Sequence, residues 1–278
     1  MSVLEFSLVV FVVSAVAGFL GSLTGLGGGV VITPVLTLLL GVDLHYAMGA
    51  SLVSVIATSS GAAAAYVKEG FSNIRVGMFL EIATTLGAVA GAHLTAVVPG
   101  SALAVIFGGV LLYSAWHSFQ SHTEHLAAST DSIAARLRLD GSYPAPEGKV
   151  PYHVQRVKGG FSLMFGAGLL SGLLGIGSGA MKVIAMDQVM RIPFKVSTTT
   201  SNFMIGVTAA ASAGIYLRHG YLEPGLAMPV MLGVLAGSIA GARQLIGART
   251  RVLRWLFAGV VGVMAVEMIY NGVSGGIQ

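Results

Sequence analysis

Residues 25–34 read GLGGGVVITP and residues 175–184 read GIGSGAMKVI, so one pattern of small and apolar residues returns 150 positions later. Both stretches belong to a register that continues without a gap from Gly18, which matches Gly168, to residue 92. A register of this length is typical of a fold in which one structural unit occurs twice. We therefore expect the chain to consist of two similar halves.

The composition places these halves in a membrane. Hydrophobic residues make up 55% of the 278 residues and charged residues only 9%, whereas a soluble domain has about 25% charged residues because its surface faces water. The net charge of +4 does not indicate nucleic acid, because the basic residues cluster beside apolar segments, where they set orientation. The chain contains no Cys, so disulfides and thiol chemistry are excluded. The lipid bilayer is the expected partner, and nucleic acid is not.

Each half divides into five apolar elements. In the N-terminal transmembrane repeat, residues 1–119, they are expected at 5–23, 28–41, 45–67, 74–98 and 101–119. In the C-terminal transmembrane repeat, residues 159–278, they are expected at 159–174, 178–190, 196–217, 225–246 and 252–273. The polar residues 120–158 between the repeats are expected to form a loop, with a short helix near 132–139.

The distribution of basic residues decides between full crossings and re-entrant segments for the short elements 28–41 and 178–190. If all ten elements cross, thirteen of the fifteen Lys and Arg residues fall on one side, together with the loop 120–158. The positive-inside rule then favours ten crossings and a cytoplasmic loop. Five crossings per half is an odd number, so the second half must be upside down relative to the first. The predicted fold is an all-α polytopic membrane protein of two inverted five-helix repeats, with helices broken at the glycine motifs.

The glycine motifs predict a substrate site. Three or four Gly within five residues disfavour helix by about 1 kcal/mol each relative to Ala, and unwound backbone inside a membrane is tolerated only where it faces protein or a watery cavity. Paired broken helices form the substrate site in inverted-repeat transporters, and helix N-termini suit an anion. The alternative is close helix packing, which we prefer for the pairs Gly87/Gly91 and Gly237/Gly241. The candidate binding residues from the motifs are Gly27, Gly28, Gly29, Gly177, Ser178 and Gly179.

Two polar tracts follow the short elements at matching places. One contains Ser51 and the other contains Ser201 and Asn202. Hydroxyl groups in a membrane helix can bond the carbonyl one turn earlier, so these residues could serve packing alone. The amide of Asn202 cannot be satisfied in that way. We add Ser51, Ser201 and Asn202 to the candidate binding residues.

Lys182 follows Ser178 by four residues and lies in an apolar element. An ionisable side chain inside a membrane is costly and points to function. We therefore add Lys182 to the candidate binding residues, because its positive charge would add to that of the two helix N-termini. The alternatives are that Lys182 extends to the membrane surface, or that it pairs with Asp187, although a spacing of five residues places those two on different helix faces. Glu81 and Glu267 also lie in apolar elements and could carry protons, but the sequence identifies no partner for either.

Enzyme chemistry and cofactors are not expected. No nucleophile–base pair, metal-ligand spacing or nucleotide-binding motif occurs, and the absence of a Walker A motif argues against an ATP-driven pump. We expect a secondary carrier for a small anion. An anion channel with the same site is the alternative from a different class.

The stretches GLGGGVVITP at 25–34, GIGSGAMKVI at 175–184 and STTTSN at 197–202 resemble the TauE/SafE family of sulfite-exporter-like membrane proteins. The resemblance implies export of sulfite or an organosulfonate across the bacterial inner membrane. The second half departs from the family pattern, because Ser178 replaces the middle Gly, Ile184 stands where the first half has Pro34, and Lys182 is added. A carrier for a different small organic anion is therefore a further alternative.

Overall fold

The computed structural model describes residues 3–24, 28–68, 70–119, 131–145, 148–244 and 250–276. In the first half, the helices are α1 (Val3–Thr24), α2 (Gly29–Pro34), the π-helix η1 (Val35–Leu39), α3 (Leu44–Lys68), α4 (Ile74–Leu94) and α5 (Gly100–Phe119). In the second half, they are α7 (Val157–Leu174), α8 (Gly179–Ile184), the π-helix η2 (Ala185–Val189), α9 (Phe194–Arg218), α10 (Pro224–Gln244) and α11 (Thr250–Ser274). The segment between the halves contains α6 (Ser132–Leu137) and the strands β1 (Gly141–Ala145) and β2 (Gly148–Tyr152).

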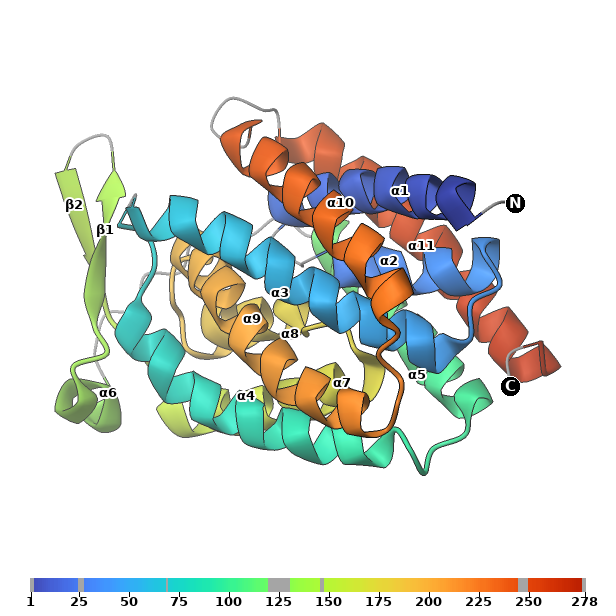
Figure 1. Ribbon diagram of the computed structural model, residues 1–278. Helices are drawn as coiled ribbons and strands as arrows, with labels where there is room; N and C mark the ends of the chain where they lie inside the picture. Colours follow the sequence, from blue (N-terminus) through green and yellow to red (C-terminus); the bar gives the residue numbers. More distant parts are fainter. Residues whose placement is uncertain are drawn as a thin grey trace.

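The repeat found in the sequence is present in the helices. α2 and α8, α3 and α9, and α4 and α10 each begin and end 150 residues apart. The helices pair across the halves, since α1 packs on α10 while its counterpart α7 packs on α4, and α3 packs on α9 (Figure 1). The predicted repeat is confirmed at this level. The inverted relation of the halves and the ten crossings stay predictions.

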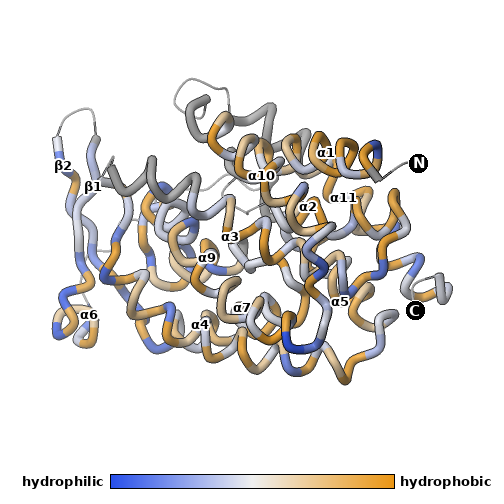
Figure 2. Tube along the Cα trace, in the orientation of Figure 1, coloured by the Kyte–Doolittle hydropathy of each residue, from blue (hydrophilic) through white to orange (hydrophobic). Residues whose placement is uncertain are grey.

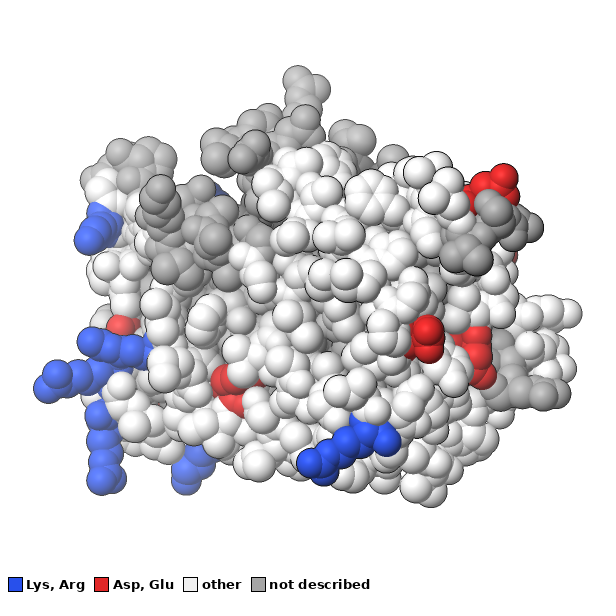
Figure 3. Space-filling model, viewed as in Figure 1, with Lys and Arg blue, Asp and Glu red and all other residues white. Residues whose placement is uncertain are grey.

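The two ends of the molecule differ in what they carry. Figure 1 shows both chain termini at one end and α6, β1 and β2 at the opposite end. On the face drawn in Figure 3, most Lys and Arg side chains gather at the end with α6 and the hairpin, and uncharged residues cover most of the middle. This is the placement expected if each half crosses the membrane an odd number of times, since both termini then lie on the side opposite the central segment.

The outer surface is apolar, as a bilayer requires. Met78, Ile82 and Leu86, four residues apart on α4, are each at least 57% exposed, while Leu80 and Thr84 on the opposite face are buried. Hydrophobic residues extend along the helices, and hydrophilic residues concentrate at the turns and the central segment (Figure 2). Among the described residues, α1, α4, α7 and α10 are long and apolar enough to cross a membrane. The chain is a polytopic, mostly α-helical membrane protein.

Close helix contact explains the glycines of α4 and α7. A Cβ on Gly87 would overlap the carbonyl of Phe165, and a Cβ on Gly168 would overlap the carbonyl of Thr84. Such contacts let two membrane helices approach until their backbones touch. Gly237 on α10 meets the carbonyl of α1 residue Ala15 in the same manner. The packing role predicted for Gly87 and Gly237 is confirmed.

Gly168→Ala should destabilise the α4–α7 contact, since the added methyl forces the helices apart at a cost of about 1–3 kcal/mol. Gly166→Ala is the matched control on the same helix, because nothing lies within 4 Å of the added Cβ. Thermal unfolding in detergent should show a lower midpoint for Gly168→Ala alone. Equal midpoints for the two variants would contradict the packing role.

The segment between the halves differs from the expected loop. The short helix expected near 132–139 is present as α6, but β1 and β2 form an antiparallel hairpin in which Gly141 lies opposite Tyr152. The hairpin adds two short strands where a loop was expected, in a protein whose described residues are mostly helical. The prolines of the segment disfavoured a strand, yet a two-stranded hairpin has only edge strands, which tolerate proline. Ladder residues Pro144 and Pro151 occupy such positions.

Asp131 connects this segment to the helical body. Its carboxylate accepts hydrogen bonds from the Ile133 backbone N–H at the start of α6 (2.9 Å) and from the Val157 backbone N–H at the start of α7 (3.2 Å). These two bonds, with Ile133 the stronger cause, hold the pKa of Asp131 below its usual value of 3.8. The contact is therefore present at neutral pH and is lost only as the pH falls through this lowered pKa.

Asp131→Ala should speed amide hydrogen exchange in α6 at neutral pH, because the first turn loses its acceptor. The parent protein should show the same acceleration only when the pH falls below 3.8, after correction for intrinsic exchange rates. Ser132→Ala is the control, since among the described residues the Ser132 hydroxyl hydrogen-bonds Asp131 alone, at 3.5 Å. Unchanged exchange in Asp131→Ala would show that this carboxylate does not hold α6.

Candidate functional site

The helix breaks at the second glycine motif. In the second half, α7 ends at Leu174 and α8 begins at Gly179. Between them Gly175, Gly177 and Ser178 have φ angles of 68°, 75° and 49°, a left-handed conformation that glycine adopts without strain and serine rarely does. In the first half, α1 ends and α2 begins around a gap at 25–27. Gly27 lies outside the described residues. The predicted break is confirmed for the second motif, and that of the first motif stays a prediction because residues 25–27 lie outside the described residues.

The two breaks meet at α3. The Ser51 hydroxyl on α3 donates to the carbonyl of Gly175 (2.8 Å), and the carbonyl of Gly29 is 3.2 Å away. One turn later, the two methyl groups of Val55 lie 2.6 Å and 2.7 Å from the positions that a Cβ on Gly29 and on Gly177 would occupy. Only residues without side chains fit there. The sequence predicted that the motifs come together, and α3 is where they do.

Ser51 and Ser201 have equivalent roles. The Ser201 hydroxyl on α9 donates to the carbonyl of Gly179 (3.2 Å), as Ser51 does to Gly29. Ser51 and Ser201 thus fasten the first residues of α2 and α8 to α3 and α9, and Ser51 also bonds the carbonyl of Gly175, which follows the end of α7. Both side chains are fully buried. We interpret the two serines as supports of the broken segments rather than as donors to an anion.

Ser51→Ala should lower stability by about 1–3 kcal/mol, because buried carbonyls would lose their donor. Ser54→Ala is the control, since the Ser54 hydroxyl bonds only the carbonyl of Ser51 in its own helix (2.6 Å). The stability of both variants is measured as the midpoint of thermal unfolding in detergent. A midpoint for Ser51→Ala no lower than that for Ser54→Ala would contradict the supporting role.

Two other predicted residues are buried with their polar atoms unused. Asn202 is 1% exposed and Ser178 is 4% exposed. Neither the Asn202 amide nor the Ser178 hydroxyl has a hydrogen-bond partner among the described residues. A buried polar group without a partner costs about 1–3 kcal/mol. These groups are therefore ready to bond a ligand or water.

Lys182 is fully buried, so the alternative that it extends to the membrane surface is wrong. Its ammonium donates to the Thr208 hydroxyl (2.5 Å) and lies 3.7 Å from Glu81 Oε2. Thr208 in turn donates to Glu81 Oε1 (2.6 Å), which also accepts from Thr85 (3.2 Å). Lys182 thus pairs with Glu81, and Asp187 is not its partner.

The sequence identifies no partner for Glu81 because the pair joins the two halves. Glu81 belongs to α4 of the first half, while Lys182 and Thr208 belong to α8 and α9 of the second. Spacing along one helix cannot show such a contact. The available signal was the presence of opposite charges in two apolar segments. Glu267, the other intramembrane carboxylate considered, lies on α11 and is exposed.

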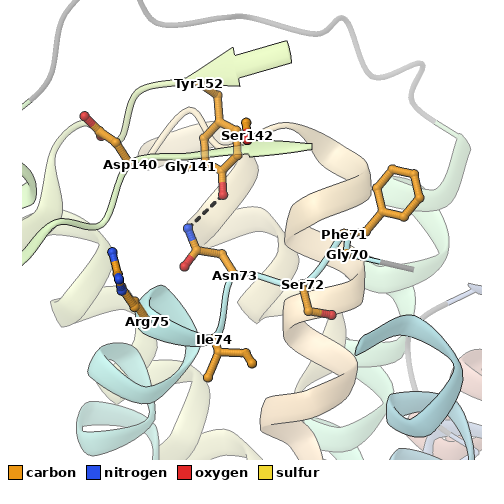
Figure 4. Close-up of a pocket in the computed structure, with 10 residues that line it drawn as sticks. All are labelled: Gly70, Phe71, Ser72, Asn73, Ile74, Arg75, Asp140, Gly141, Ser142 and Tyr152. Atoms are coloured by element: carbon orange, nitrogen blue, oxygen red, sulfur yellow. Dashed lines mark hydrogen bonds between the residues drawn. The ribbon is translucent and has the colours of Figure 1, made fainter. Parts of the chain in front are cut away.

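A cavity of about 300 Å³ lies elsewhere, between the turn joining α3 to α4 and the hairpin (Figure 4). Asn73 fastens its wall, since the amide donates to the Tyr152 hydroxyl (2.7 Å) and to the Leu139 carbonyl (2.9 Å). Burial raises the pKa of Tyr152. The Asn73 backbone N–H donates to the Thr200 hydroxyl on α9 (3.0 Å). No residue proposed from the sequence lines this cavity.

Comparisons with known proteins point to transport. A family model described as "Sulfite exporter TauE/SafE" matches residues 10–268. The chain is 26% identical to the "Probable membrane transporter protein YunE" of Bacillus subtilis (strain 168), over 95% of this chain and 98% of that protein. It is 27% identical to the "Probable membrane transporter protein YjnA" of the same strain, over 91% of this chain and 95% of that protein. No solved structure matches the chain.

Proposed function

Because this chain belongs to the sulfite exporter TauE/SafE family and is a membrane transporter, we propose that it is a secondary transporter that exports a small anion, sulfite or an organosulfonate, across the bacterial inner membrane. The substrate site lies where the two broken segments meet α3 and α9. The central segment is cytoplasmic, and the two halves are inverted repeats with five crossings each. The position of the termini opposite α6 and the hairpin supports this topology.

The unused polar groups of Asn202 and Ser178 carry the proposal. The hydrogen bond from Ser201 to Gly179 joins the residues next to them, so the two lie on neighbouring parts of α9 and the broken segment. The Asn202 amide offers two N–H donors and the Ser178 hydroxyl one. An oxyanion of sulfur presents several acceptor oxygens, and it would relieve the cost of leaving these donors buried and unpaired. Water alone could occupy the same place in the empty protein.

Hydrogen bonds and close backbone contacts hold the helices around these donors together. The backbone carbonyl of Asn202 accepts from the Ser59 hydroxyl on α3 (2.6 Å), which fastens α9 to α3 beside the site. Gly28 and Gly29, both buried, bring the first broken segment to the same helix α3. Lys182 supplies the full positive charge that amides and hydroxyls lack. A small anion with a compact charged head fits this combination of donors and charge better than a large apolar solute does.

Asn202→Leu tests the site. The substitution installs the residue found at the equivalent position of the first half, Leu52, and removes an amide with no partner among the described residues. Stability should therefore be kept or raised, while saturating export of sulfite by reconstituted protein should weaken by about tenfold to a hundredfold.

Thr199→Val is the control for this measurement, since the Thr199 hydroxyl bonds only carbonyls of its own helix, those of Lys195 and Val196. If Asn202→Leu exports sulfite as well as the parent protein does, Asn202 does not belong to the substrate site. Counterflow would support a carrier, whereas fluxes far above about 10³ ions per second would favour a channel.

A further inference from the structure

We propose that Glu81 is a proton-binding site, and that its protonation accompanies the binding of an anion beside Lys182. The inference rests on the proposed function and deepens it by assigning a coupling ion. It concerns a side chain that the substrate site itself does not require, because Glu81 carries the same charge as the substrate.

The geometry places Glu81 and Lys182 in one closed cluster. Their side chains are 10% and 0% exposed, and their charged atoms are 3.7 Å apart. Thr208 lies between them, accepting from the ammonium and donating to Glu81 Oε1. The Thr208 hydroxyl thus links the Lys182 ammonium to the Glu81 carboxylate through two hydrogen bonds.

One carboxylate oxygen is not hydrogen-bonded. Glu81 Oε2 is buried and has no hydrogen-bond partner among the described residues. Its distance of 3.7 Å from Lys182 Nζ allows an ion pair but is too long for a hydrogen bond. A buried carboxylate oxygen in this state can accept a proton without breaking the two bonds made by Oε1.

The charges require the coupling. With Lys182 positive and Glu81 negative, the cluster is neutral, and an anion entering beside Lys182 would leave one buried negative charge. An unpaired buried charge costs several kcal/mol. A proton taken up by Glu81 converts its carboxylate to a neutral carboxyl, releases Lys182 to face the anion and restores neutrality. One proton therefore enters the cluster with each singly charged anion.

The repeat does not duplicate this pair of charges. The positions equivalent to Glu81, Lys182 and Thr208 in the other half are Met231, Ile32 and Thr58. The hydroxyl is thus repeated, while both charges are not. The supporting serines Ser51 and Ser201 are repeated as well. Because the repeat duplicates the supporting serines but not the ion pair, we expect one proton site of this kind in the protein.

The elements packed against Glu81 and Lys182 carry other titratable groups, most of which lie near the ends of their helices. They are Arg75 and His93 in the end turns of α4, Lys158 at the start of α7, Asp187 in η2, and Lys195, Tyr216 and Arg218 on α9. Lys195 and Arg218 lie in the end turns of α9, and the Tyr216 hydroxyl bonds the carbonyls of Gly172 and Leu173. None of these groups contacts Glu81 or Lys182 in the described part of the chain.

The test measures binding of methanesulfonate and 2-hydroxyethanesulfonate to the full-length protein in nanodiscs between about pH 5 and about pH 9. Both probes keep one negative charge throughout this range, so a change of affinity with pH belongs to the protein. Because each bound anion is accompanied by one proton, the parent protein should bind more weakly as the pH rises, by up to about tenfold per pH unit. In weak buffer, adding either probe should draw about one proton per bound anion from the solution.

Glu81→Gln imitates the protonated state and should bind with no pH dependence and without proton uptake. Because this variant leaves a buried ammonium unpaired, the double variant Glu81→Gln/Lys182→Met provides a neutral cluster that should fold like the parent. It should bind about tenfold to a hundredfold more weakly, independently of pH.

The outcomes separate the two proposals. Binding by the parent that is independent of pH and draws no proton overturns the role of Glu81 and leaves the transporter proposal intact. Proton uptake that persists in the double variant also overturns it. Failure of the parent to bind either probe at any pH overturns the proposed function, and the coupling with it.

Discussion

A backbone amide or carbonyl inside a bilayer must find its partner within the protein, because the hydrocarbon offers none. This requirement is strictest where one apolar helix ends and the next begins without a polar loop between them, as at Leu174, where α7 ends. The Ser51 hydroxyl supplies a donor to the carbonyl of Gly175, which follows the end of α7, and the Ser201 hydroxyl bonds the first residue of α8, Gly179. Both serines sit on the long helices α3 and α9, which pack on each other. The broken segments can exist only because α3 and α9 support them.

The same requirement separates the polar residues by function. Hydroxyls that bond their own helix, such as those of Ser54 and Thr58, need nothing further. The Asn202 amide and the Ser178 hydroxyl are buried in the same region and remain unused. The charges follow a similar logic, since Lys182 is compensated by Glu81 from the other half. The scaffold and the ion pair therefore come from both halves, while the unused donors Ser178 and Asn202 come from the second half, and only the scaffold is repeated.

Much of the fold could be predicted from the sequence because the repeat states each element twice. The expected elements 45–67 and 196–217 differ from α3 and α9 by a few residues at most. The helix breaks followed from glycine density, and Lys182 followed from the cost of a buried charge. Local patterns sufficed for these features.

Features that depend on distant contacts could not be predicted. The ion pair of Lys182 with Glu81 joins residues about a hundred positions apart, and no local pattern encodes it. The π-helices η1 and η2 follow α2 and α8 in both halves, although Pro34 occurs in one half only, so proline does not determine them. The β1–β2 hairpin formed despite its prolines because its strands have free edges.

The central claim is that the anion binds where the two broken segments meet, and its position can be measured directly. Selenite has the charge and shape of sulfite and scatters X-rays anomalously at the selenium edge, so crystals soaked in selenite would reveal it. We expect a selenium peak placed so that the selenite oxygens lie within hydrogen-bonding distance of the Asn202 amide and the Ser178 hydroxyl. A peak confined to the cavity between Asn73 and the hairpin, with the region around Asn202 holding only water, would contradict it.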